Sequence, residues 1–131
     1  MILDAQGNTV KSKFIINEYI DDSQWNPQGL LLKDGNIFIT WTSSWPLSIG
    51  QDGSGVGVYG KIINSSGNTI KSEFRINDYT NGNQYNYSTP PLLLANGNIF
   101  VTLMSETQDG SGYGVYAKIY NANGIVLNSE F

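Results

Sequence analysis

The feature that most constrains this chain is a twelve-residue string that occurs twice. Residues 51–62 read QDGSGVGVYGKI, and residues 108–119 read QDGSGYGVYAKI. Two copies of so specific a string in 131 residues indicate a tandem repeat. A repeat of this kind buries little apolar surface alone, so we expect the units to stack on one another.

The repeat extends on both sides of this string. Residues 7–14 match residues 67–74 (74 − 14 = 60) and again residues 124–131 (131 − 74 = 57). Residues 30–41 likewise match residues 92–103. No linker or change of composition separates the copies. The sequence therefore predicts a single domain that consists of a leading half-hairpin (residues 1–17), unit one (residues 18–76) and unit two (residues 77–131).

Each unit is expected to contain four antiparallel strands. Asp34-Gly35 and Asn96-Gly97 predict tight hairpin turns, because Asp or Asn followed by Gly tolerates positive φ. No segment has apolar residues at helical spacing. The strands expected in unit one are residues 29–32, 36–42, 57–63 and 68–76. Their counterparts in unit two are residues 91–94, 98–104, 114–120 and 125–131.

Four short strands followed by a polar crossover are typical of a β-propeller blade. We therefore expect an all-β fold of propeller-like blades, with a β-sandwich as the alternative. A propeller needs about 4–8 blades to close, so two units are too few. The chain is then part of a longer protein, or it completes itself by assembling with other copies.

Assembly is expected for a second reason. The leading strand would be an exposed edge, and the outer faces of a two-unit stack would carry bare apolar side chains. We expect a homo-oligomer or fibre, in which residues 2–16 are engaged by a neighbouring copy. Deletion of residues 1–16 is then expected to abolish assembly or to leave insoluble protein.

Composition excludes several classes of function. The net charge is −4 with only 7 Lys and Arg, which argues against nucleic acid as a partner. No apolar run approaches the about 18 residues of a membrane span, so we expect no membrane insertion. The chain has no Cys and no His, which excludes disulfides and His-based triads. Residues 1–4 do not resemble a signal peptide.

The two Asp-Gly-Ser-Gly loops are candidate metal sites. Asp52 and Asp109, with nearby Ser hydroxyls and carbonyls, offer the oxygen ligands that calcium prefers. One carboxylate per loop is few for calcium, and neither the EF-hand spacing nor the glycine-rich calcium nonapeptide occurs. We therefore expect turns held by the carboxylates and no cofactor, with calcium as the alternative.

Aromatic residues in the expected loops are candidate ligand-binding residues. Trp25 and Tyr85 occupy matching positions in the two units. They either stack on a sugar ring or fill gaps between sheets, and their repetition favours the second role. Trp45 lies in an insertion that unit two lacks. We expect Trp45 to be exposed or to contact another subunit.

No arrangement of residues predicts catalysis. Asp21, Asp22, Asp78 and Glu106 are the carboxylates that a glycosidase-like pair would draw on. They lie in expected connectors and loops, and no motif pairs them. We expect the protein not to be an enzyme.

The motif QDGSGxGVY, followed by NxxG and then SEFxIN, resembles a tandem repeat of very large bacterial surface and secreted proteins. Adhesins and calcium-binding proteins of the RTX type are among them. The strand ending Ile39-Thr40-Trp41 is similar to the Val-Thr-Trp usual in that family, whereas Leu103 departs from it. The resemblance covers nearly the whole chain. It implies an extracellular or cell-surface scaffold or adhesion role and offers no catalytic residues.

Together these features predict a non-enzymatic repeat module of a surface or structural protein that self-assembles through its β units. The alternative is a carbohydrate-binding module that uses the loop aromatics.

Overall fold

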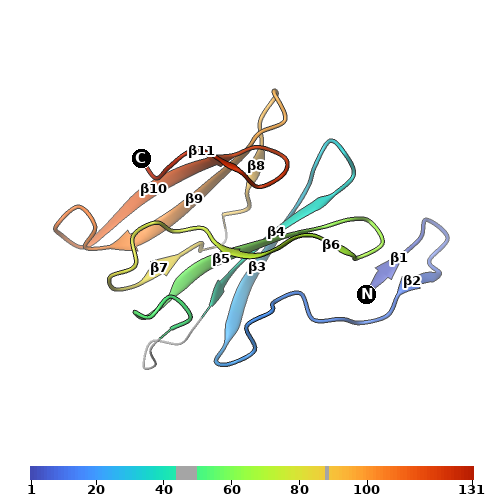
Figure 1. Cartoon of the computed structure of the whole chain (residues 1–131), viewed down its shortest axis with the longest axis horizontal. Helices are drawn as coiled ribbons and strands as arrows, with labels where there is room; N and C mark the ends of the chain where they lie inside the picture. The colour runs from blue at the N-terminus through green and yellow to red at the C-terminus, as the bar shows by residue number, and fades with distance from the viewer. Residues whose placement is uncertain (44–49, 88) are drawn as a thin grey trace.

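The computed structural model describes residues 1–43, 50–87 and 89–131, and the expected all-β class is confirmed over these ranges. The strands form antiparallel sheets of two, four and five strands, and none of these sheets closes on itself (Figure 1). No helix in the described ranges is long and apolar enough to cross a membrane.

Unit one forms the four-stranded sheet. Its strands, in spatial order, are β3 (Gln24–Leu31), β4 (Ile37–Ser43), β5 (Gly57–Ile63) and β6 (Thr69–Arg75). All four expected strands are present, and β3 begins five residues before its expected start at residue 29. The turn between β3 and β4 is tight, with Gly35 at a φ of 81° and its N–H donating to the carbonyl oxygen of Leu32 at 3.1 Å, but Asp34 does not share the positive φ.

Unit two forms the five-stranded sheet. Its strands are β7 (Gln84–Tyr85), β8 (Leu92–Leu93), β9 (Ile99–Glu106), β10 (Tyr113–Tyr120) and β11 (Val126–Asn128). Both β7 and β8 pair with β9, so together they take the place that β3 has in unit one. Unit two carries two extra residues between them, including a second proline next to Pro91. Proline donates no ladder hydrogen bond, which accounts for the interruption.

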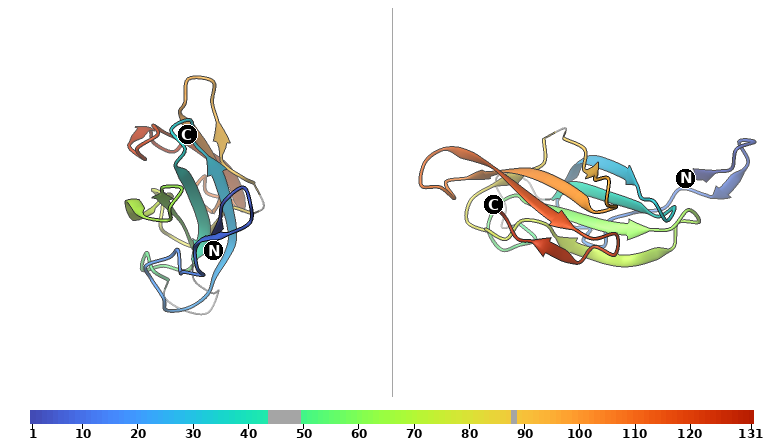
Figure 2. Two further views of the ribbon diagram at one scale, coloured as in Figure 1. Left: turned by 90° about the vertical axis from the view of Figure 1, so that its right-hand side faces the viewer. Right: turned by 90° about the horizontal axis from the view of Figure 1, so that it is seen from above.

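The leading residues form a separate small hairpin. Its strands β1 (Ile2–Leu3) and β2 (Thr9–Lys11) pair only with each other. The hairpin lies at one end of the molecule, next to the β5–β6 turn (Figures 1 and 2).

The main core lies between the two larger sheets, which pack face to face. Successive residues of a strand point to opposite faces, so Phe38 lies on one face of the unit-one sheet and Trp41 on the other. We call the face with Phe38 the forward face and the face with Trp41 the rear face. The corresponding faces of unit two carry Phe100 and Leu103.

The forward face of unit one packs against the rear face of unit two. The buried residues at this junction are Leu32, Phe38, Val58, Ile62, Ile76, Ile99, Val101, Leu103 and Tyr120. Burying each such side chain contributes about 1.5–3 kcal/mol, so this junction is the main source of stability. It leaves the rear face of unit one and the forward face of unit two at the two ends of the stack.

Candidate functional site

The junction between the units is completed by the connector that follows β6. Lys118, on the rear face of unit two, is buried and lies 2.5 Å from Asp78 Oδ1 and 2.9 Å from the carbonyl oxygen of Ile76. Burial alone would raise the pKa of Asp78, but the hydrogen bond from Lys118 helps hold that pKa below its usual value. The connector is thereby fixed to the next unit by a buried cation.

Two further contacts hold this junction. Glu130 accepts a hydrogen bond from the backbone N–H of Asp78 at 2.5 Å and another from Gln108 Nε2 at 2.9 Å. Lys71, on β6, donates to the carbonyl oxygen of Gly124 in the β10–β11 turn. A methyl group at Gly124 would lie 2.8 Å from Lys71 Cδ, and Gly124 has a φ of 71°, so glycine at this position lets the lysine lie close across the turn.

The same set of contacts recurs where the leading segment and the connector after it lie on unit one. Lys61 pairs with Glu18 at 2.8 Å, as Lys118 pairs with Asp78. The carboxylate of Glu73 accepts from the backbone N–H of Glu18 at 2.6 Å, and Lys11 donates to the carbonyl oxygen of Gly67. The leading segment therefore lies on unit one as β6 and its connector lie on unit two. We expected a neighbouring copy to engage this segment, but its own chain already holds it.

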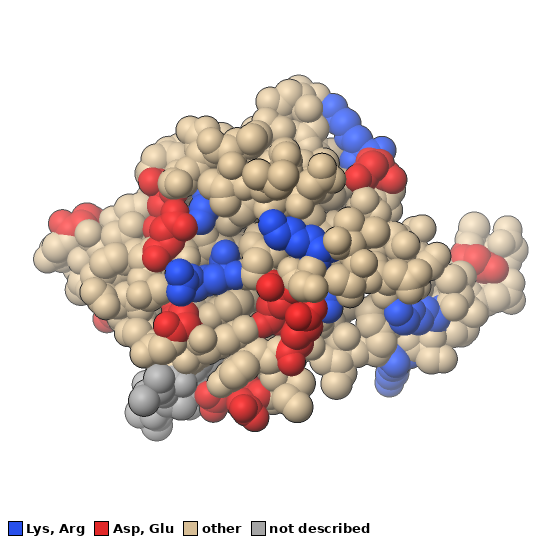
Figure 3. Space-filling model, in the orientation of Figure 1, with Lys and Arg blue, Asp and Glu red and all other residues tan. Residues whose placement is uncertain are grey.

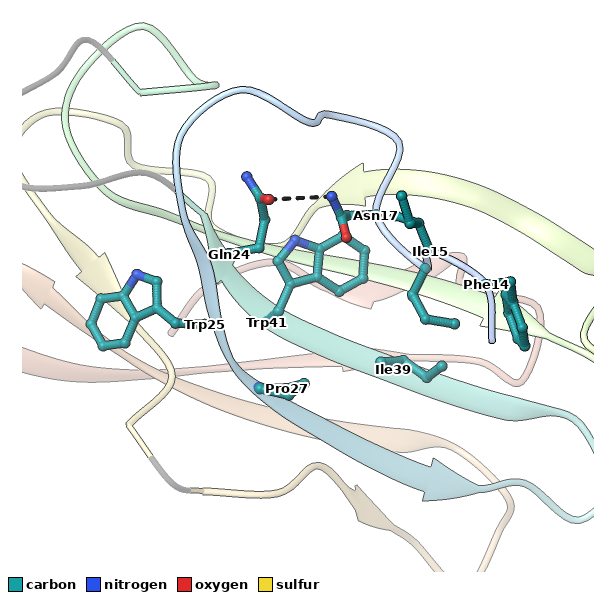
Figure 4. Close-up of a pocket in the computed structure, with 9 residues that line it drawn as sticks. Phe14, Ile15, Asn17, Gln24, Trp25, Pro27, Ile39 and Trp41 are labelled. Atoms are coloured by element: carbon teal, nitrogen blue, oxygen red, sulfur yellow. Dashed lines mark hydrogen bonds between the residues drawn. The ribbon is translucent and has the colours of Figure 1, made fainter. Parts of the chain in front are cut away.

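The rear face of unit one carries an apolar groove where a preceding sheet would pack. The groove has a volume of about 290 Å³, and residues of the leading segment, β3 and β4 line it. Trp41 lies beneath the loop that carries Asn17, whose amide donates to Gln24 Oε1 at 3.2 Å (Figure 4). The indole Nε1 of Trp41 is buried and has no hydrogen-bond partner among the described residues.

The forward face of unit two is the complementary uncovered surface. Val58 and Val115 occupy the same position of the repeat. Val58 is fully buried against unit two, whereas Val115 is 74% exposed. Phe100 and Ile119 on the same face are partly exposed, and the equivalent residues of unit one are fully buried. A sheet face built for packing is therefore left open to solvent.

An aromatic cluster spans the edge of the two larger sheets. Trp25 meets Tyr85 and Tyr87 edge to face, each at a centroid distance of 5.8 Å, and Tyr85 stacks on Tyr87 at 4.7 Å. Tyr113 lies 6.2 Å from Tyr85. Burial raises the pKa of Tyr85 to about 12. Tyr87 and Tyr113 are about half exposed, so one side of the cluster faces solvent.

This cluster places two of the residues singled out from the sequence. Trp25 and Tyr85 were expected in connectors, but they lie at equivalent positions of strands β3 and β7 and contact each other across the two sheets. Trp25 points away from Trp41, on the other side of β3 (Figure 4). Trp45 falls within residues 44–49, which lie outside the described residues.

The two acidic loops are closed by their own carboxylates. Asp52 Oδ1 accepts from the backbone N–H of Ser54 at 3.1 Å, and Asp109 Oδ1 accepts from that of Ser111 at 3.2 Å. These are the turns that the sequence predicts. The described residues contain no cluster of three or more acidic, His or Cys side chains that could hold a metal ion.

Two of the four carboxylates considered for catalysis have structural roles. Asp78 pairs with Lys118, and Glu106 accepts from Asn83 Nδ2 at 2.7 Å. On the face shown in Figure 3, acidic and basic side chains lie beside one another and no large patch has a single sign.

Comparisons with known proteins give no further guide. No protein-family model, no curated protein and no solved structure matches the chain.

Proposed function

We propose that this chain is a non-enzymatic repeat module of an extracellular or cell-surface structural protein, in which propeller-like units stack and copies assemble head to tail. The observation that supports it is the contrast between Val58 and Val115. The forward face that unit one buries against unit two is repeated on unit two, where it is open.

The chain also offers a surface for that face to cover. The groove over Trp41 lies on the rear face of unit one, and the corresponding face of unit two, around Leu103, is fully covered by unit one. A contact between two different faces is heterologous, and it produces a ring if the rotation closes and a fibre if it does not. The extracellular assignment comes from the resemblance of the repeat motif.

Val115→Asp tests the assembly. A carboxylate at this exposed position should leave the monomer folded but should disrupt an apolar contact between copies. We expect the wild-type chain to show a mass that rises with concentration in sedimentation equilibrium, and the variant to remain a monomer. Ile20→Asp is the matched control, because Ile20 is 72% exposed and lies on neither face.

The outcome that contradicts the proposal is equally clear. A wild-type chain that remains monomeric up to millimolar concentration would exclude functional self-assembly through these faces. So would a Val115→Asp variant that associates as the wild-type chain does.

Carbohydrate binding by the aromatic cluster is a second candidate function. Its support is the half-exposed pair Tyr87 and Tyr113 beside the buried Tyr85, since exposed aromatic faces are suited to stacking on sugar rings. A glycan array should then show one preferred sugar class, and Tyr87→Ala should abolish that signal. An array without any signal for the wild-type chain would remove this candidate.

A further inference from the structure

The two ends of the chain carry hairpins that occupy equivalent positions of the repeat. Residues 1–14 align with residues 118–131 at a constant spacing (131 − 14 = 117), which is the length of the two repeats. Under this alignment Ile2 corresponds to Ile119, Gly7 to Gly124 and Phe14 to Phe131. The chain thus contains two full repeats and one hairpin in excess.

The leading hairpin lies on unit one in the position of a preceding unit. A methyl group at Gly67 would lie 2.7 Å from Lys11 Cδ, 2.9 Å from Ile2 Cδ1 and 3.1 Å from Phe14 Cζ. At the equivalent Gly124, a methyl group would lie 2.8 Å from Lys71 Cδ and 3.2 Å from Ile62 Cδ1.

These contacts have a steric consequence. Ile62 and Lys71 belong to the sheet that packs on unit two, and Ile2 and Lys11 are their counterparts in the hairpin. A second copy stacked on unit one with the same geometry would place its residues 118–131 where residues 1–14 lie. Both hairpins cannot occupy this position.

We propose that the leading hairpin is an intramolecular plug on the docking face of unit one, and that the C-terminal hairpin of a second copy displaces it when copies assemble. This inference rests on the proposed head-to-tail assembly. It identifies the occupant of the rear face of unit one as the forward face and C-terminal hairpin of another copy of this chain.

The leading hairpin, and not the C-terminal one, is displaced, because fewer strand pairings hold it in place. Its strands β1 and β2 have two and three residues and join no other sheet. An isolated two-stranded hairpin is marginally stable at best. The C-terminal hairpin, by contrast, includes β10, which pairs with β9 along all eight of its residues.

The displacement leaves the rest of the junction in place. The pair between Lys61 and Glu18 lies after the hairpin and is retained.

Of the three residues that contact Gly67, Ile2 and Phe14 recur in the C-terminal hairpin and Lys11 does not. Lys11 donates to the carbonyl oxygen of Gly67, whereas the corresponding residue of the C-terminal hairpin is Asn128. Asparagine is too short to make the equivalent contact. The plug therefore has a bond that the incoming hairpin lacks, and this bond favours the closed monomer.

Two variants of the full chain test the plug, one with a change in the leading hairpin and one with a change in the C-terminal hairpin. Lys11→Met should weaken the plug, and Asn128→Lys should give the incoming hairpin the missing bond. The apparent Kd equals the intrinsic Kd divided by the open fraction, so Lys11→Met should lower the self-association Kd by raising the open fraction. Asn128→Lys should lower it by strengthening the intrinsic contact, and we expect about tenfold for each change. The measurement is sedimentation equilibrium of each variant beside the wild-type chain, with thermal melting to confirm that the fold is intact.

A third measurement follows the plug itself. Hydrogen exchange of residues 2–11 should become faster as the wild-type chain assembles, because the displaced hairpin loses its contacts. A chain that lacks residues 1–14 should associate at least as tightly as Lys11→Met. Addition of Val115→Asp to any of these variants should return it to a monomer, which separates docking from non-specific aggregation.

The results distinguish the plug from the assembly on which it rests. If Lys11→Met and deletion of residues 1–14 leave the Kd unchanged or raise it while the wild-type chain assembles, the plug is wrong and the assembly stands. If no form associates, the proposed assembly fails as well. Association that persists in the Val115→Asp background would also overturn the inference.

Discussion

At the scale of single residues, the repeat places the same residue in two different environments, so the two can be compared. Asn77 is 1% exposed, and its Oδ1 accepts from the buried backbone N–H of Val58 at 2.8 Å. Its amide donates to the carbonyl oxygen of Tyr79 at 2.8 Å. Asn17 is the equivalent residue and donates in the same way to the carbonyl oxygen of Tyr19.

Asn77→Ala should be far more damaging than Asn17→Ala. The first change leaves a buried N–H without a partner, and we expect it to lower the free energy of unfolding by about 2–3 kcal/mol. The second removes a donor from a less buried site and should cost about 1 kcal/mol. Urea denaturation of both variants measures the difference, and equal losses would show that the bond to Val58 carries no special weight.

The ion pairs that fix the two connectors, Lys118 with Asp78 and Lys61 with Glu18, predict how stability depends on pH. Side-chain hydrogen bonds from Lys118 and Lys61 help hold the pKa of Asp78 and of Glu18 below their usual values of 3.8 and 4.5. A carboxyl group whose pKa is lower in the folded state stabilises the fold above its unfolded pKa. That contribution is lost as the pH falls through the folded pKa.

We therefore expect the melting temperature to be flat near neutral pH and to fall below about pH 4. Asp78→Asn should reduce that acid-dependent fall, because it removes the carboxylate of one of these two ion pairs. Thermal melts from pH 7 to pH 2 measure the effect. A variant with the same acid dependence as the wild-type chain would show that Asp78 does not contribute.

The residue-level pattern that reasoning from the sequence missed is the spacing of Lys and Phe. Lys11 and Phe14 recur as Lys71 and Phe74, and in each pair the ammonium lies over the ring, at 4.4 and 4.3 Å from its centroid. Asn128 breaks the pattern. The recurrence was visible in the sequence, but its meaning depends on the turn that each lysine crosses, which only the folded chain shows.

At the scale of elements, alternation and turn residues predicted most strands. β5 has the expected bounds at Gly57–Ile63, because a run of strand formers lies between two turns. β3 begins five residues earlier than expected, although Asn26 and Pro27 are residues that usually interrupt a strand. The structure accommodates them in a bulge between Trp25 and Gln28, with Asn26 at a φ of 51°, on an edge strand that tolerates proline.

The acidic loops lead to a prediction about metal removal. Asp52 and Asp109 each accept a backbone N–H within their own loop, so the loops should hold their shape without a cation. We expect a chelator to leave the melting temperature unchanged. We also expect Asp109→Asn to change it little, since the amide oxygen can accept the same bond. A clear drop on chelation would instead indicate calcium bound to the folded state.

At the scale of the whole molecule, the sequence predicted the number of units and their likeness but not which face meets which. The alternation in β4 places Phe38 and Trp41 on opposite faces without saying which one faces unit two. The packing of Phe38 on Tyr120, at a centroid distance of 6.3 Å, settles this point. It also shows that the leading segment covers part of the chain's own end face, which the repeat alignment alone does not show.

Head-to-tail assembly predicts the behaviour of a mixture of two blocked chains. Val115→Asp removes the forward end face, and Ile39→Asp, in the groove, should remove the rear end face. Each variant retains one intact face, so each should be a monomer alone. Mixed in equal amounts they should form a dimer of one copy of each and nothing larger, because the intact forward face of one meets the intact rear face of the other.

Sedimentation of the mixture measures this mass, and melting of each variant alone confirms its fold. If Ile39→Asp dimerised by itself, two forward faces would be pairing with each other, and the stack inferred from the repeat would be the wrong arrangement.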